Sequence, residues 1–261
     1  MTAGDDPGAA ARGDSAGRPW EGRSFGPTGA FAADDGATPP GFQRARDAFR
    51  SGEVGLTAVV DSLRGARLLV PLVAAAGEVG REGGRVVDKS QELALVTVAG
   101  PDGRAVLPAF SSTAAMAAWN PSARPVPAPA RQVALGAASD GTELVIVDPA
   151  SPERVGLRRS ALEALARDLP WTPPFEDPEV GRAIRAAVDG EPAVTTARVA
   201  AGDPRASLDG AEVAVLVVLH ETLDQAAAGA LVSRLQQRWA ADPVVRARVD
   251  SMAVRLAAEF C

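Results

Sequence analysis

Lys89 and Ser90 are the first candidates for chemistry, because a lysine beside a serine can form a catalytic pair. Lys89 is the only lysine among the 27 lysine and arginine residues of the chain. A catalytic lysine needs a pKa lowered by burial or by a neighbouring cation, whereas Asp88 and Glu92 favour the charged ammonium. Adjacent residues at a strand entrance also point to opposite faces. The pattern favours a solvated lysine, and binding through Asp88 and Lys89 is the alternative.

His220 is the only histidine, and it lies between the apolar run VAVLVVL and a predicted helix cap at Thr222. One histidine without a nearby cysteine cannot form a histidine-based zinc site. The glycine-rich segment 75–87 lacks the G-K-[ST] of a phosphate-binding loop, and we predict a surface loop there. No serine stands in the G-x-S-x-G context of a nucleophile elbow; those considered are Ser90, Ser111, Ser112 and Ser251. The sequence therefore predicts no catalytic residue, no metal site and no cofactor.

The composition limits the partners and the compartment. The chain has 261 residues, a net charge of −6, a pI near 5.0 and no run of basic residues, and such a chain is repelled by nucleic acid. Its longest apolar runs are about half of a membrane span, and it opens without the apolar core of a signal peptide. A single cysteine, Cys261, cannot form an internal disulfide, which fits a reducing compartment. We predict a soluble, cytoplasmic protein that binds neither nucleic acid nor membranes.

Apolar periodicity predicts an α+β domain that follows a polar arm. Residues 1–39 are rich in Gly, Ala, Asp and Pro and predict a flexible arm, whose aromatic residues either strap it to the body or bind a partner. Segment 39–66 has two apolar stripes at helical spacing and predicts two helices. Segment 66–74 predicts a buried strand that Pro71 pushes toward an edge or a bulge. Segment 92–110 predicts two strands around a Pro-Asp-Gly turn.

The order strand, turn, strand, helix then occurs a second time. Ser111 or Ser112 is predicted to cap a short helix after the first pair of strands. The proline-rich segment 121–130 is predicted to be a connector, and a weak helix follows it. Segment 143–158 again predicts strand, turn and strand. Segment 159–169 predicts a helix with three leucines on one face, which are Leu162, Leu165 and Leu169. The two ββα units are either a duplication or a common architectural unit.

The C-terminal part predicts a smaller sandwich of helices on a sheet. A helix near 177–188 precedes two strands around a loop at 202–210. The longest predicted helix, 223–242, carries one apolar stripe, formed by Leu231, Leu235 and Trp239. In the last strand, 251–260, alternate residues face the core; they are Met252, Val254 and Leu256.

These elements predict an α+β fold class. It has a mixed or antiparallel sheet with repeated ββα units, and a smaller C-terminal α/β sandwich. Three parts follow along the chain: a flexible arm at 1–39, an α+β domain at 40–175, and a linker helix with the C-terminal sandwich at 176–261.

The segment WTPPFEDPEV is the best candidate for a binding surface. Its prolines preset an extended backbone, which lowers the entropy that docking would cost. Trp171 and Phe175 supply large contact areas, and Glu176 and Asp177 complete the candidate. The alternative is a strap that packs on its own domain and fixes the linker.

An ordered series of phrases resembles the actinobacterial SseB family. The phrases are ARLLVPLVA, DKSQELALVTVAGPDGRAVLPAFSS, AAWNPSARPVPAPA, ELVIVDPASP and LPWTPPFEDPEV. The resemblance covers roughly residues 40–180 well and includes the SseB N-terminal domain, named for an enhanced-serine-sensitivity protein. It implies an α+β domain without established catalytic residues.

The sequence thus favours a non-catalytic interaction or regulatory module whose partner is another cytoplasmic protein. Two other functions stay open: an enzyme whose site is built from Arg, Asp and Glu only, and a small-molecule sensor in the C-terminal sandwich. An enzyme or a sensor requires a concave cavity lined by polar residues, whereas a binding module requires an exposed patch. The sequence indicates neither the oligomeric state nor the identity of the partner.

Overall fold

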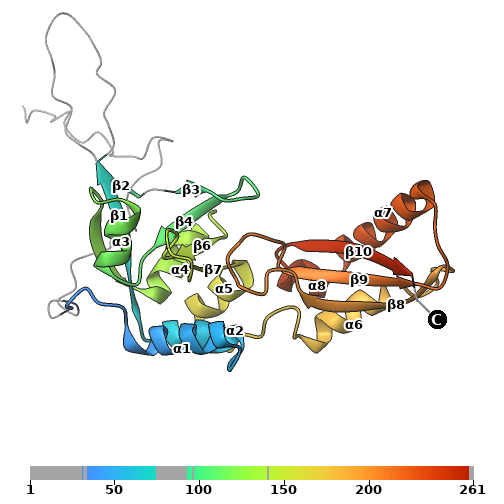
Figure 1. Cartoon of the computed structure of the whole chain (residues 1–261), viewed down its shortest axis with the longest axis horizontal. Helices are drawn as coiled ribbons and strands as arrows, with labels where there is room; N and C mark the ends of the chain where they lie inside the picture. The colour runs from blue at the N-terminus through green and yellow to red at the C-terminus, as the bar shows by residue number, and fades with distance from the viewer. Residues whose placement is uncertain (1–30, 32–33, 75–92, 96, 140, 259–261) are drawn as a thin grey trace, which may run out of the picture. The chain divides into compact units, whose positions relative to one another are not determined.

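The computed structural model describes residues 31, 34–74, 93–95, 97–139 and 141–258 (Figure 1). Asp88, Lys89, Cys261 and nearly all of the predicted arm lie outside the described residues. The chain divides into two compact units, residues 1–34 and residues 35–261. Helices and mixed or antiparallel sheets confirm the α+β fold class. The predicted boundary between 175 and 176 falls inside the second unit and stays a prediction.

The first two helices follow the predicted apolar stripes. They are α1 (Pro40–Ser51) and α2 (Leu56–Leu63). Pro40 occupies the first turn of α1, where its missing N–H is not needed. Gly52 ends the helix with a φ of 79°, a left-handed conformation that suits glycine. Phe42 in α1 and Val59, Val60 and Leu63 in α2 are buried, so both stripes face the core.

Pro71 lies in a central strand, so its predicted place at an edge or a bulge is wrong. The sheet has the order β2-β1-β5, and its central strand is β1 (Arg67–Ala74). Leu69 exchanges both backbone hydrogen bonds with Phe110, while β2 (Leu93–Leu95) pairs only with Leu72–Ala74. Residues 69 and 71 point their backbone groups to the same side of the strand. The nitrogen of Pro71 therefore lies between the Leu69–Phe110 bridge and the pairing with β2, where the described residues place no backbone acceptor for it.

The proline-rich segment predicted as a connector contains an edge strand, β5 (Arg124–Pro129), which pairs antiparallel with β1. Proline occupies every second position of β5, at 125, 127 and 129. Pro127 lies opposite Leu69, whose N–H and C=O point away from β5 toward Phe110. All three prolines therefore turn their nitrogens to the open side of the sheet, where no donor is needed. The same arrangement blocks the addition of another strand at this edge.

The second sheet holds the second predicted strand pair and only part of the first, because Leu93–Leu95 of the first pair lie in β2 of the other sheet. Its order is β3-β4-β6-β7, formed by β3 (Val98–Ala99), β4 (Ala105–Ala109), β6 (Val145–Val147) and β7 (Val155–Leu157). β4 and β6 run parallel, and the outer pairs are antiparallel. The helices of this part are α3 (Thr113–Trp119), α4 (Ala130–Ser139) and α5 (Arg159–Arg167). The order ββα thus occurs twice, whereas a duplication stays a prediction.

The ends of two helices refine the predictions. Ser112 caps α3, since its hydroxyl accepts the backbone N–H of Ala115 at 3.1 Å. Leu162 and Leu165 in α5 are buried as predicted. Leu169 is 50% exposed because the helix ends at Arg167, and Asp168 then turns the chain with a φ of 58°. Leu169 therefore does not continue the apolar face.

The C-terminal part is a three-stranded sheet with helices on one face. The elements are α6 (Pro178–Ala186), β8 (Val194–Ala201), β9 (Val213–Leu219), α7 (Gln225–Ala241), α8 (Pro243–Arg248) and β10 (Met252–Ala258). The sheet order is β10-β9-β8 (Figure 1). β8 and β9 are antiparallel, whereas β9 and β10 are parallel and joined through α7 and α8. Asp224, and not Thr222, caps α7 by accepting the N–H of Ala227 at 2.8 Å.

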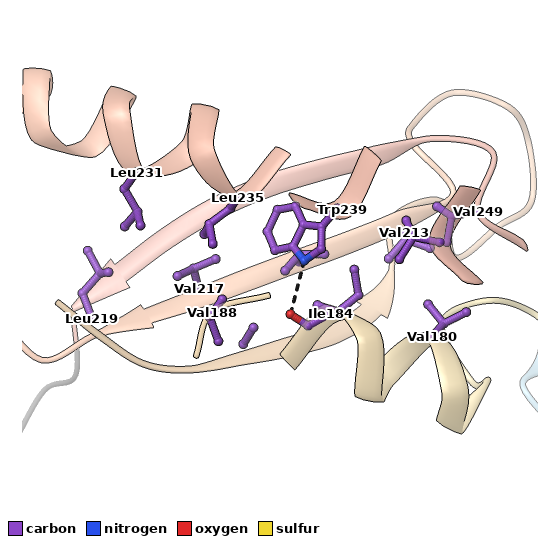
Figure 2. Packing of buried hydrophobic residues seen from close by; sticks show 13 residues of the cluster. Val180, Ile184, Val188, Val213, Val217, Leu219, Leu231, Leu235, Trp239 and Val249 are labelled. Atoms are coloured by element: carbon purple, nitrogen blue, oxygen red, sulfur yellow. Dashed lines mark hydrogen bonds between the residues drawn. The ribbon is translucent and has the colours of Figure 1, made fainter. Parts of the chain in front are cut away.

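The core of this part confirms the predicted stripe of α7. Leu231, Leu235 and Trp239 are buried and point toward the strands (Figure 2). The Trp239 indole N–H donates to the carbonyl of Ile184 in α6 at 3.2 Å, so the two helices share one core. Burial of each such side chain stabilises the fold by about 1.5–3 kcal/mol.

The loop 202–210 carries a core residue of the C-terminal part to the β3-β4-β6-β7 sheet. Leu208 is 6% exposed and packs with Val106, Leu144 and Ile146. Position 156 must be glycine, because a Cβ there would lie 2.3 Å from Leu208 Cγ. The Gly156 N–H also donates to the carbonyl of Ala206 at 2.6 Å. The two predicted domains therefore share a packed contact.

Candidate functional site

The structure places the predicted aromatic residues inside the fold. Trp171 is 8% exposed, and its indole N–H donates to Ser160 Oγ at 3.1 Å. Phe175 is half-buried against the C-terminal core, whereas Glu176 is exposed. Both aromatic side chains thus anchor the linker on its own chain. Binding of a partner by this segment stays a prediction.

Asp177 has a structural task at the start of α6. Its carboxylate accepts the N–H of Glu179 at 2.8 Å and pairs with Arg248 at 2.6 Å. Burial raises the pKa of Asp177, but the Arg248 ion pair and the Glu179 N–H together lower that pKa below its usual value. A cleft of about 390 Å³ borders Trp171 and Asp177. Asp88 and Lys89, the other predicted binding residues, lie outside the described residues.

A buried ion network is the place where an enzyme built from Arg, Asp and Glu would have its site. Arg158 is 8% exposed and bonds Asp250 Oδ2 at 3.1 Å and Asp203 Oδ2 at 3.3 Å. Asp250 also accepts a two-pronged pair from Arg104, at 2.8 and 2.9 Å. These contacts satisfy the charges internally and tie the last strand to the β3-β4-β6-β7 sheet.

Glu212 completes this network and has the most perturbed carboxyl group in it. Burial and the charge of Asp250 raise the pKa of Glu212 to about 7, although the Asp250 N–H donates to the carboxylate at 2.7 Å. The void beside Arg158 and Glu212 measures about 20 Å³. Such a void holds about one water molecule. The network can store a proton, but it has no room for a substrate.

An open sheet face lies on the side of the C-terminal sheet that its helices leave uncovered. Every second residue of β8, β9 and β10 faces the core, and in β9 these residues are Val213, Val215 and Val217. The residues between them face outward. We call this outer set the arginine face; it consists of Thr196, Arg198, Ala200, Ala214, Leu216, Val218, Ala253, Arg255 and Ala257. The set contains no acidic residue and no aromatic residue.

Two arginines dominate this face. Arg198 in β8 and Arg255 in β10 are both in register with Leu216 of the central strand β9. Two strand spacings separate them, or about 10 Å. Both are exposed, and neither forms a hydrogen bond or an ion pair within the described part of the chain. Two unpaired cations beside one leucine form a surface suited to bind carboxylates.

Sequence reasoning missed this pair, although one signal was present. The alternation that directs Met252, Val254 and Leu256 inward also directs Arg255 outward. The position of Arg198 beside it depends on the pairing of β8 with β9, which periodicity does not specify. His220, the other candidate, is exposed in a bend after β9.

Two features are absent from the described part of the chain. No helix in the described ranges is long and apolar enough to cross a membrane. Within the same ranges, no three His, Cys, Asp or Glu side chains are grouped so that they could hold a metal ion.

Comparison with known proteins gives one match. Residues 43–164 match the family model of the SseB protein N-terminal domain. No curated protein and no solved structure matches the chain. The match begins within α1 and ends within α5, and the arginine face lies outside it. The actinobacterial type stays a prediction.

Proposed function

We propose that this chain, whose residues 43–164 match the SseB protein N-terminal domain, is a member of the SseB family and a non-catalytic interaction module. It binds an acidic segment of another protein through the arginine face. The observation that carries this proposal is the register of Arg198, Leu216 and Arg255 across three strands. We place the partner in the cytoplasm, together with this chain.

Charge supports an acidic partner. The whole chain has a net charge of −6, yet the arginine face bears two exposed arginines and no carboxylate. An arginine guanidinium binds carboxylates with two parallel hydrogen bonds. A second copy of the chain is disfavoured as the occupant, because face-to-face packing would bring four arginines together. Nucleic acid is disfavoured because the face lacks the aromatic side chains on which bases stack.

The spacing suggests the form of the partner. Residues i and i+7 of an α-helix lie about 10.5 Å apart along its axis, which matches the distance of about 10 Å between Arg198 and Arg255. A helix that crosses the strands can therefore place glutamates at i and i+7 over the arginines. Its apolar residues at i+3 and i+4 then contact Leu216.

The buried chemistry supports a non-catalytic role. The network of Arg158, Asp250 and Glu212 encloses a void of about 20 Å³, too small for a substrate. The small-molecule sensor is the second candidate function. It is favoured by a cavity of about 310 Å³ beside α7 and β10, with Trp239 and Met252 in its lining.

We predict that charge reversal on the arginine face abolishes binding of an acidic helix. The probe is a labelled synthetic helix with glutamates at i and i+7 and leucines at i+3 and i+4, and binding is measured by fluorescence anisotropy. The double variant Arg198→Glu/Arg255→Glu should weaken binding at least about tenfold, or about 1.4 kcal/mol. Added salt should weaken binding to the unchanged protein, since exposed charges are screened.

The control for this experiment is Arg182→Glu. Arg182 lies in α6 and its side chain is 69% exposed, so its reversal changes the net charge as much as each single reversal on the arginine face does, without touching that face. The proposal is contradicted if Arg182→Glu weakens binding as much as the double variant does. It is also contradicted if the unchanged protein binds an oligonucleotide or a second copy of itself through this face, and not the peptide.

A further inference from the structure

Two polar residues lie side by side at the carboxyl ends of parallel strands. Asp148 directly follows β6, and Ser111 follows β4 after one intervening residue. β4 and β6 are parallel neighbours, and Ala109 pairs with Val147 in their last register position. Ligands of open α/β sheets bind outside the carboxyl ends of such strands. Neither residue belongs to the arginine face or to the segment WTPPFEDPEV.

A buried polar network fixes both residues. Asp148 is 3% exposed; it accepts the Ser111 N–H at 2.8 Å through Oδ1 and the Ser111 hydroxyl at 2.6 Å through Oδ2. Arg46 of α1 donates to the same carboxylate at 3.3 Å. Asp148 has a φ of 56°, a conformation that costs a non-glycine residue about 1–3 kcal/mol. Residues held in this way cluster at binding sites.

A cavity of about 350 Å³ opens onto this network. That volume is within the usual range of small-molecule pockets. Besides Arg46, Ser111 and Asp148, its lining combines three more hydroxyl groups with three small apolar side chains, which are Thr38, Ser112, Ser151, Ala115, Ala118 and Ala150. The alanines leave the space open, and the hydroxyls provide the polar contacts.

The hydroxyls have a defined polarity. Ser112 Oγ accepts the N–H of Ala115, and Ser151 Oγ accepts the N–H of Glu153 at 3.0 Å, so both hydroxyls retain their hydrogens for donation. Ser111 gives its hydrogen to Asp148. Thr38, at 3.0 Å from Ser111 Oγ, therefore donates to Ser111 and keeps its lone pairs. The cavity offers two donors and one acceptor.

The charged side chains of the site are already paired with one another. Arg46 pairs with Asp148 at 3.3 Å and with Glu153 at 3.4 Å. A ligand with a full charge would have to disrupt one of these pairs. Arg46 Nε, by contrast, is buried without a hydrogen-bond partner, so one donor of the lining still lacks an acceptor oxygen.

We propose that this cavity binds a small, uncharged, oxygen-rich molecule of the polyol or sugar class. Such a molecule has hydroxyls that accept from Ser112 and Ser151 and donate to Thr38. The site binds and does not catalyse, because Ser111 is only 1% exposed and its hydroxyl already bonds Asp148 and Thr38. The proposal adds a ligand site in the SseB N-terminal domain and does not depend on the arginine face.

The test measures backbone amide shifts by NMR in the full-length protein, with glycerol, myo-inositol, ribose and glucose as probes. At least one probe should give saturable shifts at Ser112 and Ser151. Ala118→Phe, which fills the cavity from α3, should weaken that binding at least about tenfold. The control Ala117→Phe places the same ring on the next residue of α3, which is exposed and does not line the cavity, and should retain binding.

Three outcomes would overturn the proposal. The first is the absence of saturable shifts with all four probes. The second is an equal loss of binding in Ala117→Phe and Ala118→Phe, which would indicate damage to α3. The third is tighter binding of gluconate than of glucose, which would show that the site takes an anion.

Discussion

Replacing Arg158 by methionine should lower the free energy of unfolding by about 3 kcal/mol. The guanidinium lies between Asp203 and Asp250, whose side chains are 5% and 1% exposed. Methionine conserves much of the volume but leaves buried carboxylates with fewer donors. Removal of one partner from a buried ion pair is strongly destabilising, because the remaining charge is uncompensated. Urea unfolding at pH 7 measures the difference.

Two companion variants separate the effect of the lost charge on stability from the effect of altered packing. Arg182→Met removes an arginine from an exposed pair with Glu179, and such pairs contribute under about 1 kcal/mol. Arg158→Met/Asp250→Asn removes both charges and should recover part of the stability lost in Arg158→Met. The free-energy losses of Arg158→Met and Asp250→Asn are also measured separately. If the double variant loses more than their sum, the network does not act as paired charges.

The second large effect concerns pH, through Glu212. Burial raises the pKa of Glu212 to about 7 from an ordinary value of 4.5. A raised pKa means that the folded state binds the proton more tightly than the unfolded state does. The stabilisation is therefore complete below pH 4.5 and is lost as the pH rises through 7. At about 1.4 kcal/mol per pKa unit, the free energy of unfolding should fall by about 3 kcal/mol across this window.

Glu212→Gln tests this expectation, because glutamine is neutral at every pH. The stability of the variant relative to the unchanged protein should rise between pH 5 and pH 8, as measured by urea unfolding. Asp250 affects stability in a different pH range. Burial raises its pKa, but Arg104 and Arg158 outweigh burial and lower the pKa below its usual value. Its contribution is lost only in more acidic solution. Parallel stability profiles of the two proteins would show that Glu212 titrates normally.

The helices were largely predictable from the sequence. The stripe of Leu231, Leu235 and Trp239 is buried on α7 as its spacing predicts. Residues three and four apart share a helix face wherever the helix is placed, so local order is sufficient for the prediction. The start of α7 at Asp224 was missed, because Thr222 is an equally acceptable cap by residue type.

The proline-rich segment shows where local reasoning failed. Prolines at 125, 127 and 129 suggested a connector, yet they lie in the edge strand β5. Their spacing of two was the overlooked signal, since alternate residues of a strand turn their nitrogens to one side. Only the pairing with β1 decides that this side is the open one.

The sequence by itself determined which residues of β10 face the core, because side chains alternate along any strand, and with that it determined that Arg255 faces outward. The tertiary structure alone decided that Arg198 lies in register beside it across Leu216. In the same way, only the parallel pairing of β4 with β6 brings Ser111 and Asp148 within hydrogen-bond distance. The physical reason is that strand register and sheet order depend on contacts between segments distant in the chain, which local spacing does not encode.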